Sequence, residues 1–69
     1  MNRIIVIKKM NMIINVNNIQ YCNIINIGVD VTMANDHTIR IISDNPKKLY
    51  NLIKCFIIDN TENYVLEID

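Results

Sequence analysis

The chain has 69 residues and no net charge, and 51% of its residues are hydrophobic. A chain of this length forms one domain, buries only about 60% of its unfolded surface and is marginally stable. We therefore expect a single domain over residues 1–69. Zero net charge excludes a global electric field that would attract nucleic acid or an acidic membrane.

The cysteine and histidine content excludes a structural zinc site, which needs four ligands at short paired spacings. The chain has only Cys22, Cys55 and His37. No N-terminal segment resembles a signal peptide, because the first apolar run ends at Lys8. We expect a cytoplasmic protein with two free thiols, no metal and no other cofactor.

Isoleucine and asparagine make up 28 of the 69 residues. This bias is typical of AT-rich coding sequences, which are common in phages, mobile elements and low-GC bacteria. We therefore interpret the asparagines as a product of coding bias and not as the stacked amide ladder of a fibril.

The first half of the chain predicts strands. Residues 3–8 are β-branched and bounded by charge, and residues 10–16 alternate apolar and polar side chains. Asn17 and Asn18 predict a tight turn, because asparagine tolerates positive φ. In residues 19–33, apolar side chains recur at odd-numbered positions. This pattern predicts a single long strand that is bent or bulged near Gly28. Asn23 falls on the core face of that strand, so either a bulge shifts the register or Asn23 lies at the sheet margin.

The second half predicts a loop at residues 34–37, a strand at 38–43, a helix at 46–58 and a last strand at 64–68. Ser-Asp-Asn-Pro at residues 43–46 is a helix start signal, because the first three are good N-caps and proline favours the first helical position. The apolar stripe of this helix consists of Leu49, Leu52, Ile53, Phe56 and Ile57. Residues 59–63 end the helix.

The predicted fold is α+β: an antiparallel sheet of four to five strands with one helix packed on one face, in the order ββββαβ. One helix covers only one face of a sheet. The opposite face nevertheless carries aliphatic side chains, of which Ile13 is the clearest because it interrupts a row of asparagines. Strand one adds either Ile4 with Val6 or Ile5 with Ile7, whichever pair points away from the helix.

An aliphatic side chain left in water forgoes about 1.5–3 kcal/mol of burial free energy, and a patch of several hundred Å² usually marks an interaction site. We predict a protein interface on this uncovered face. Its predicted residues are Ile13, Ile24, Ile42, Val65, Asn11, Asn15, Asn26 and Arg40. The competing interpretation is that these are single exposed aliphatics, which are normal on protein surfaces, or that AT-rich coding placed them there.

The predicted helix also carries Lys47, Lys48 and Lys54 without a compensating acid. Three lysines on one helix face can contact phosphates. Weak RNA or DNA binding is therefore the alternative function, and no membrane partner is expected.

No catalytic constellation is apparent. His37 stands beside Asp36 in a predicted turn, the hydroxyl residues lack a nucleophile-elbow context, and a single glycine cannot form a phosphate-binding loop. We expect a non-catalytic protein-binding module that forms a homodimer or docks on a larger complex. The small size and AT-rich composition also resemble those of proteins that phages and mobile elements encode. By this analogy, we expect an inhibitor of a nuclease-based defence complex (anti-CRISPR-like) within that class.

Overall fold

The computed structural model describes residues 3–58 and 64–69. Its elements are β1 (Ile4–Ile7), η1 (Lys8–Met10), β2 (Met12–Asn15), η2 (Val16–Asn18), β3 (Ile19–Ile25), β4 (Gly28–Met33), β5 (Thr38–Ile42), α1 (Pro46–Ile58) and β6 (Val65–Ile68), where η1 and η2 are 3₁₀ turns. The α+β class with a single helix is confirmed for the described residues. The helix bounds agree with those predicted, and the predicted segment 59–63 lies outside the described residues.

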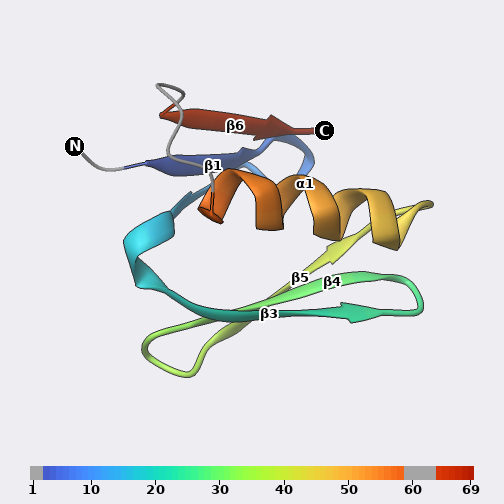
Figure 1. The fold of residues 1–69 in the computed structure, drawn as a ribbon, viewed down its shortest axis with the longest axis horizontal. Helices are drawn as coiled ribbons and strands as arrows, with labels where there is room; N and C mark the ends of the chain where they lie inside the picture. Colours follow the sequence, from blue (N-terminus) through green and yellow to red (C-terminus); the bar gives the residue numbers. More distant parts are fainter. Residues whose placement is uncertain (1–2, 59–63) are drawn as a thin grey trace.

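The strands form two sheets of three strands each (Figure 1). In sheet A the order is β2-β1-β6, with β1 antiparallel to β2 and parallel to β6. In sheet B the order is β3-β4-β5, and both pairs are antiparallel. The predicted single sheet is therefore wrong. The cause is η2, which carries the chain from sheet A to sheet B where a hairpin turn was expected.

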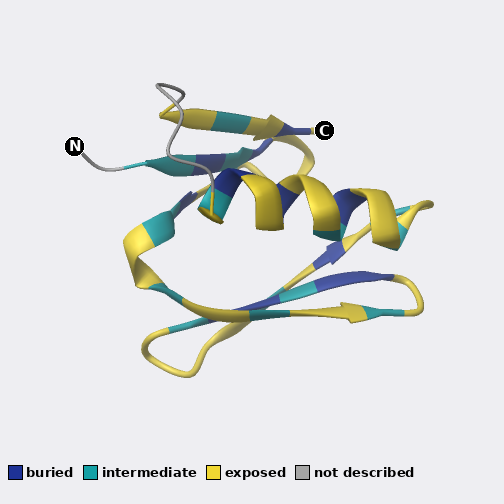
Figure 2. Ribbon diagram, viewed as in Figure 1, coloured by how far each residue is buried: buried dark blue, intermediate teal, exposed yellow. Residues whose placement is uncertain are grey.

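One core lies between the two sheets and α1, so that each sheet turns one face inward (Figures 1 and 2). The helix runs between the sheets and contacts β3 and β4 of sheet B. The buried core residues are Ile5, Ile7, Ile14 and Ile68 of sheet A, Val29, Val31 and Ile41 of sheet B, and Leu49, Ile53 and Phe56 of α1. Leu52 was predicted to face the core but is 46% exposed. The guanidinium of Arg3 lies 4.0 Å from the centre of the Phe56 ring.

Local capping sets the start of α1 as the sequence predicts. The side-chain oxygen of Asn45 accepts a hydrogen bond from the Lys48 amide at 3.2 Å, and its carbonyl accepts one from the Leu49 amide at 3.1 Å. Asn45 is therefore the N-cap, and Pro46 stands at the first helical position, where its missing N–H costs nothing. Among the described residues, no helix is long and apolar enough to cross a membrane.

The predicted long strand 19–33 is a hairpin of β3 and β4, with Asn26 and Ile27 as its two-residue turn. Gly28 is the first residue of β4, and its φ is not positive. Glycine is required there by space, because a Cβ atom on Gly28 would lie 1.9 Å from the backbone carbonyl oxygen of Ile41 in the neighbouring strand β5. The close approach of β5 explains this glycine, whereas the predicted bend does not.

A register shift in β3 accounts for the anomaly at Asn23. The pairing of β3 with β4 is irregular between Ile19 and Tyr21 and regular from Tyr21 onward. Asn23 then stands opposite Asp30 on the outer face of sheet B, and it is exposed. The first of the two open interpretations is correct. Because of a bulge, the even-numbered residues of β3 face inward beyond residue 20, and the odd-numbered residues face outward.

The remaining turns are formed by residues with positive φ or by side-chain hydrogen bonds to the backbone. Asn11 ends η1 in the left-handed conformation, with φ of 49°. The Asn15 side chain accepts a hydrogen bond from the Asn17 amide at 3.0 Å, so η2 forms without the positive φ expected at residues 17 and 18. The predicted loop at residues 34–37 is confirmed, with Asp36 at φ 68°.

We predict that Gly28→Ala lowers the free energy of unfolding by about 2–3 kcal/mol, because the added methyl group meets rigid backbone and not the end of a flexible side chain. Urea unfolding followed by circular dichroism measures the change. Asn23→Ala, on the exposed outer face of the same sheet, is the control and should change stability by less than about 0.5 kcal/mol. Equal effects for the two variants would contradict the close-packing explanation.

Candidate interaction surfaces

The outer face of sheet A carries a continuous row of aliphatic side chains. Ile4 pairs with Val65 of β6 and Val6 pairs with Ile13 of β2, so these four residues form a diagonal band across three strands. Asn15 stands opposite Ile4 and Glu67 stands opposite Val6, on either side of this band. Their alternates on β1, Ile5 and Ile7, are fully buried in the core. Ile13 is 67% exposed and Val65 is 50% exposed, and Ile4 and Val6 are half-buried between them. We call Ile4, Val6, Ile13 and Val65 the sheet A patch.

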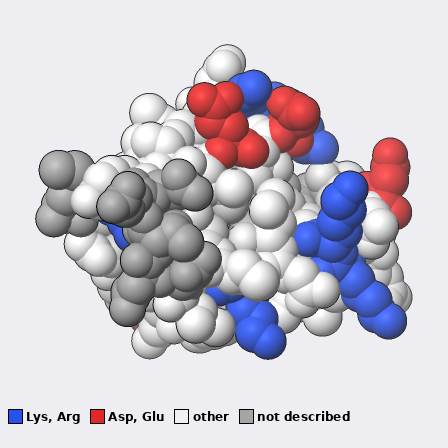
Figure 3. Space-filling view, turned by 45° about the horizontal axis from the view of Figure 1, so that its top comes forward, with Lys and Arg blue, Asp and Glu red and all other residues white. Residues whose placement is uncertain are grey.

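Charges at the rim of the sheet A patch neutralise one another. The Lys8 ammonium lies 3.0 Å from a Glu67 carboxylate oxygen and 3.5 Å from one of Asp69. The hydrogen bond with Glu67 is the largest cause that raises the pKa of Lys8 above its ordinary value. In the surface view, acidic side chains gather beside a basic one at one edge, and other basic groups lie apart from them (Figure 3). The patch is therefore apolar with a paired ionic rim.

The outer face of sheet B is more polar. The Arg40 guanidinium donates two hydrogen bonds to the Asp30 carboxylate, at 2.9 and 3.1 Å. The hydroxyls of Thr32 and Thr38 lie 3.1 Å apart in the next cross-strand pair. Ile42 is 49% exposed and stands at the end of this face, where its backbone carbonyl accepts a hydrogen bond from Lys9.

The predicted interface is therefore not one surface. Ile13 and Val65 belong to sheet A, whereas Ile42 and Arg40 belong to sheet B. Ile24 stands opposite Val29, a core residue, so it points to the inner side of sheet B; it remains 44% exposed because β3 is an edge strand. The division into two sheets and the bulge in β3 explain both corrections.

The predicted interface asparagines have local structural roles. Asn11 has positive φ at the end of η1, Asn15 caps η2, and Asn26 lies in the turn between β3 and β4. Asparagine is favoured at such positions because it tolerates positive φ and its side chain bonds to nearby backbone. These roles account for the three residues without any partner.

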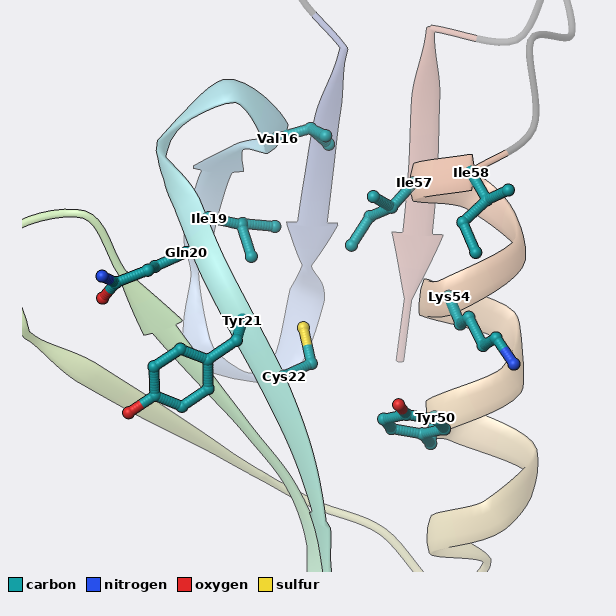
Figure 4. Close-up of a pocket in the computed structure, with 9 residues that line it drawn as sticks. All are labelled: Val16, Ile19, Gln20, Tyr21, Cys22, Tyr50, Lys54, Ile57 and Ile58. Carbon is teal, nitrogen blue, oxygen red and sulfur yellow. The ribbon is translucent and has the colours of Figure 1, made fainter.

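A groove that the sequence analysis missed lies between β3 and α1 (Figure 4). Its volume is about 210 Å³. Ile19 and Cys22 of β3 point toward the helix, Tyr50 and Ile57 point back toward β3, and Tyr21 points away. The remaining lining residues are Val16, Gln20, Lys54 and Ile58. Burial raises the pKa of the Cys22 thiol, so Cys22 contributes to the groove as a neutral apolar side chain.

The three helix lysines are exposed but do not form one cluster. Lys47 and Lys48 stand in the first turn of α1, and Lys54 lies about two turns further along, beside the groove. No acid stands in that first turn, and the two lysines lie near the positive end of the helix dipole, where positive charge is unfavourable.

The polar residues considered for catalysis are dispersed. His37 is exposed in the turn between β4 and β5, Cys55 is exposed on α1, and both cysteines are free. Within residues 3–58 and 64–69, no group of three or more histidine, cysteine, aspartate or glutamate side chains is placed to hold a metal ion. Comparisons with protein-family models, with curated proteins and with solved structures find no match to this chain.

The Asp30–Arg40 pair should make the free energy of unfolding of the protein depend on pH. The hydrogen bond from Arg40 holds the pKa of Asp30 below its ordinary value. The pair therefore stabilises the fold fully above the ordinary aspartate pKa of about 3.9, and this contribution is lost as the pH falls through the lowered value. We expect Arg40→Gln to lower the free energy of unfolding at neutral pH and to have little effect at an acid pH at which Asp30 is protonated in the fold, as measured by urea unfolding at both pH values.

Lys47→Gln is the matched control for this experiment, because it removes one exposed positive charge that lies on α1 and is not paired with Asp30. Its effect should not follow the titration of Asp30. A loss in Arg40→Gln that is equally large at both pH values would contradict an ionic role for the pair.

Proposed function

We propose that the protein is a non-catalytic protein-binding module that docks through the sheet A patch. The observation that carries this proposal is the exposure of Ile13 and Val65 beside Ile4 and Val6 on one continuous face. Apolar side chains that remain in water on adjacent strands gain burial free energy when a partner covers them. The outer face of sheet B has paired polar groups in the corresponding positions, so it gains less from being covered.

The small area of the sheet A patch indicates how large its partner must be. A three-stranded sheet face four residues long spans about 14 by 13 Å. A standard interface buries about 800 Å² on each partner. The partner must therefore extend past the strands, for example into the hollow lined by Val6, Lys8, Asn11 and Ile13 beside η1. This favours a larger protein over a second copy that contributes only the same small face. The narrower class, an inhibitor encoded by a phage or mobile element, stays a prediction.

Site-specific photo-crosslinking tests the docking surface. With a photoreactive amino acid at position 13, irradiation in the native host should give an adduct with another protein, whereas irradiation of the purified protein would reveal a second copy if one docks there. Either adduct should have one discrete mass. Position 27 is the control, because Ile27 is 51% exposed in the turn between β3 and β4 of sheet B and is not part of the sheet A patch. Position 13 reacting no better than position 27 would refute the sheet A patch as an interface.

The variant Ile13→Lys should abolish the adduct with the same partner that forms when the photoreactive group stands at position 65, on the other edge strand of this face. Because Ile13 is largely exposed, we expect the free energy of unfolding to change by less than about 0.5 kcal/mol. Thermal unfolding measures this change. Loss of the adduct with unchanged stability separates docking from folding.

Nucleic-acid binding is a second candidate, because α1 carries three exposed lysines and no acid. If it operates, replacing Lys47, Lys48 and Lys54 with glutamate should eliminate salt-sensitive binding to single-stranded RNA and DNA in a fluorescence anisotropy titration. The same triple variant should leave the sheet A adduct unchanged. Wild-type protein that fails to bind at low salt would remove this candidate.

A further inference from the structure

We propose that the groove between β3 and α1 binds an extended segment of another protein, which pairs with the free edge of β3 and adds a fourth strand to sheet B. The segment carries apolar side chains at alternate positions and at least one carboxylate. This site is separate from the sheet A patch, and its argument does not depend on that patch.

The free edge of β3 carries backbone groups that pair with no described strand. The Met33 amide donates to the His37 carbonyl on the β5 side, and in an antiparallel strand the direction of bonding alternates from residue to residue. The backbone of Thr32, Asp30 and Gly28 therefore bonds to β3 at Tyr21, Asn23 and Ile25. The N–H and C=O groups of Cys22 and Ile24 consequently point away from β4, toward the side on which no described strand pairs with β3.

The other edge strands are shorter, and several carry protective charges. β2 and β6 have four residues each, and Glu67 and Asp69 lie in and beside β6. β5 contains Arg40, and Lys9 bonds to its last carbonyl. β3 has seven residues and none of them is charged. Short strands and charges are the usual protection against edge pairing, so β3 is the least protected edge among the described strands.

The groove supplies the side-chain sites that pairing at an edge needs. In strand addition, the backbone gives affinity and pockets for alternate side chains give specificity. Cys22 and Ile19 point into the groove from β3, and Tyr50 and Ile57 line it from α1 (Figure 4). A strand added beside β3 therefore places every second side chain against this apolar lining.

Charge complementarity selects another protein over a second copy. Among the described residues that line the groove, only Lys54 is charged. A second copy paired through its own β3 brings no carboxylate in that strand and a second Lys54 to the interface. Lys54 lines the groove at its α1 side, and its ammonium points away from β3 (Figure 4). An aspartate or glutamate at the α1 side of a bound segment can therefore pair with Lys54, while the apolar residues of the segment match the remaining lining.

A phage-displayed library of random heptapeptides, selected on the immobilised full chain, tests the proposal. We expect enriched peptides with alternate apolar residues and an acid. Synthetic copies of these peptides should bind the wild-type protein in a fluorescence anisotropy titration. Lys54→Glu should weaken binding about tenfold, whereas Lys47→Glu on the same helix should change it less than about twofold.

A second matched pair tests the apolar lining. Ile58→Ser removes a groove residue that is 67% exposed, and Leu52→Ser removes a residue of the same helix that is 46% exposed and does not line the groove. Only Ile58→Ser should weaken the peptides. In hydrogen exchange measured by NMR, bound peptide should slow the amides of Cys22 and Ile24, which report edge pairing directly.

Three results would overturn the proposal. One is a library without enriched peptides. Another is an enriched peptide whose affinity is insensitive to Lys54→Glu and Ile58→Ser but falls with Ile13→Lys, which would assign it to the sheet A patch. The third is concentration-dependent protection of the Cys22 and Ile24 amides in the free protein, together with a dimer in sedimentation, because a second copy would then occupy the edge.

Discussion

The fold depends on one core that is shared by two small sheets and a single helix. An amphipathic helix offers one apolar stripe, and a strand offers alternate side chains to each face, so a flat sheet under one helix would leave half of its aliphatic residues in water. The two sheets reduce this exposure because each turns one face to the same core. Ile5, Ile7 and Ile14 of sheet A and Val29, Val31 and Ile41 of sheet B thereby become buried. Two small outer faces and the free edge of β3 remain outside this core.

The sequence predicts features whose cause is local. The helix bounds follow from Asn45, Pro46 and the apolar spacing, and the turn before β5 follows from residues that tolerate positive φ. It does not predict the division into two sheets, because an Asn-Asn pair suits a hairpin turn and a 3₁₀ turn equally well. Only tertiary packing decides between them, and here β2 pairs with β1 and not with β3.

The candidate surfaces were harder to predict, because one error in assigning which residues of a strand face inward affects every later residue of that strand. Side chains in a strand alternate with period two, so one extra residue exchanges the inner and outer sets beyond it. The bulge near Ile19 moves Ile24 inward and Tyr21 outward. Asn23 on a supposed core face was the available signal of this shift. Ile13 and Val65 were placed correctly on an outer face because no bulge intervenes in β1, β2 or β6.

The bulge also limits what β3 can pair with. An open strand edge in an isoleucine-rich chain favours aggregation, because identical edges of many copies can pair with one another. In β3 the regular segment is confined to residues 21–25, between the bulge and the turn at Asn26 and Ile27. A segment this short forms few backbone hydrogen bonds, so pairing at the edge alone is weak. Binding then requires side chains that fit the groove beside α1, and the geometry of β3 thereby favours recognition of particular segments over unlimited association.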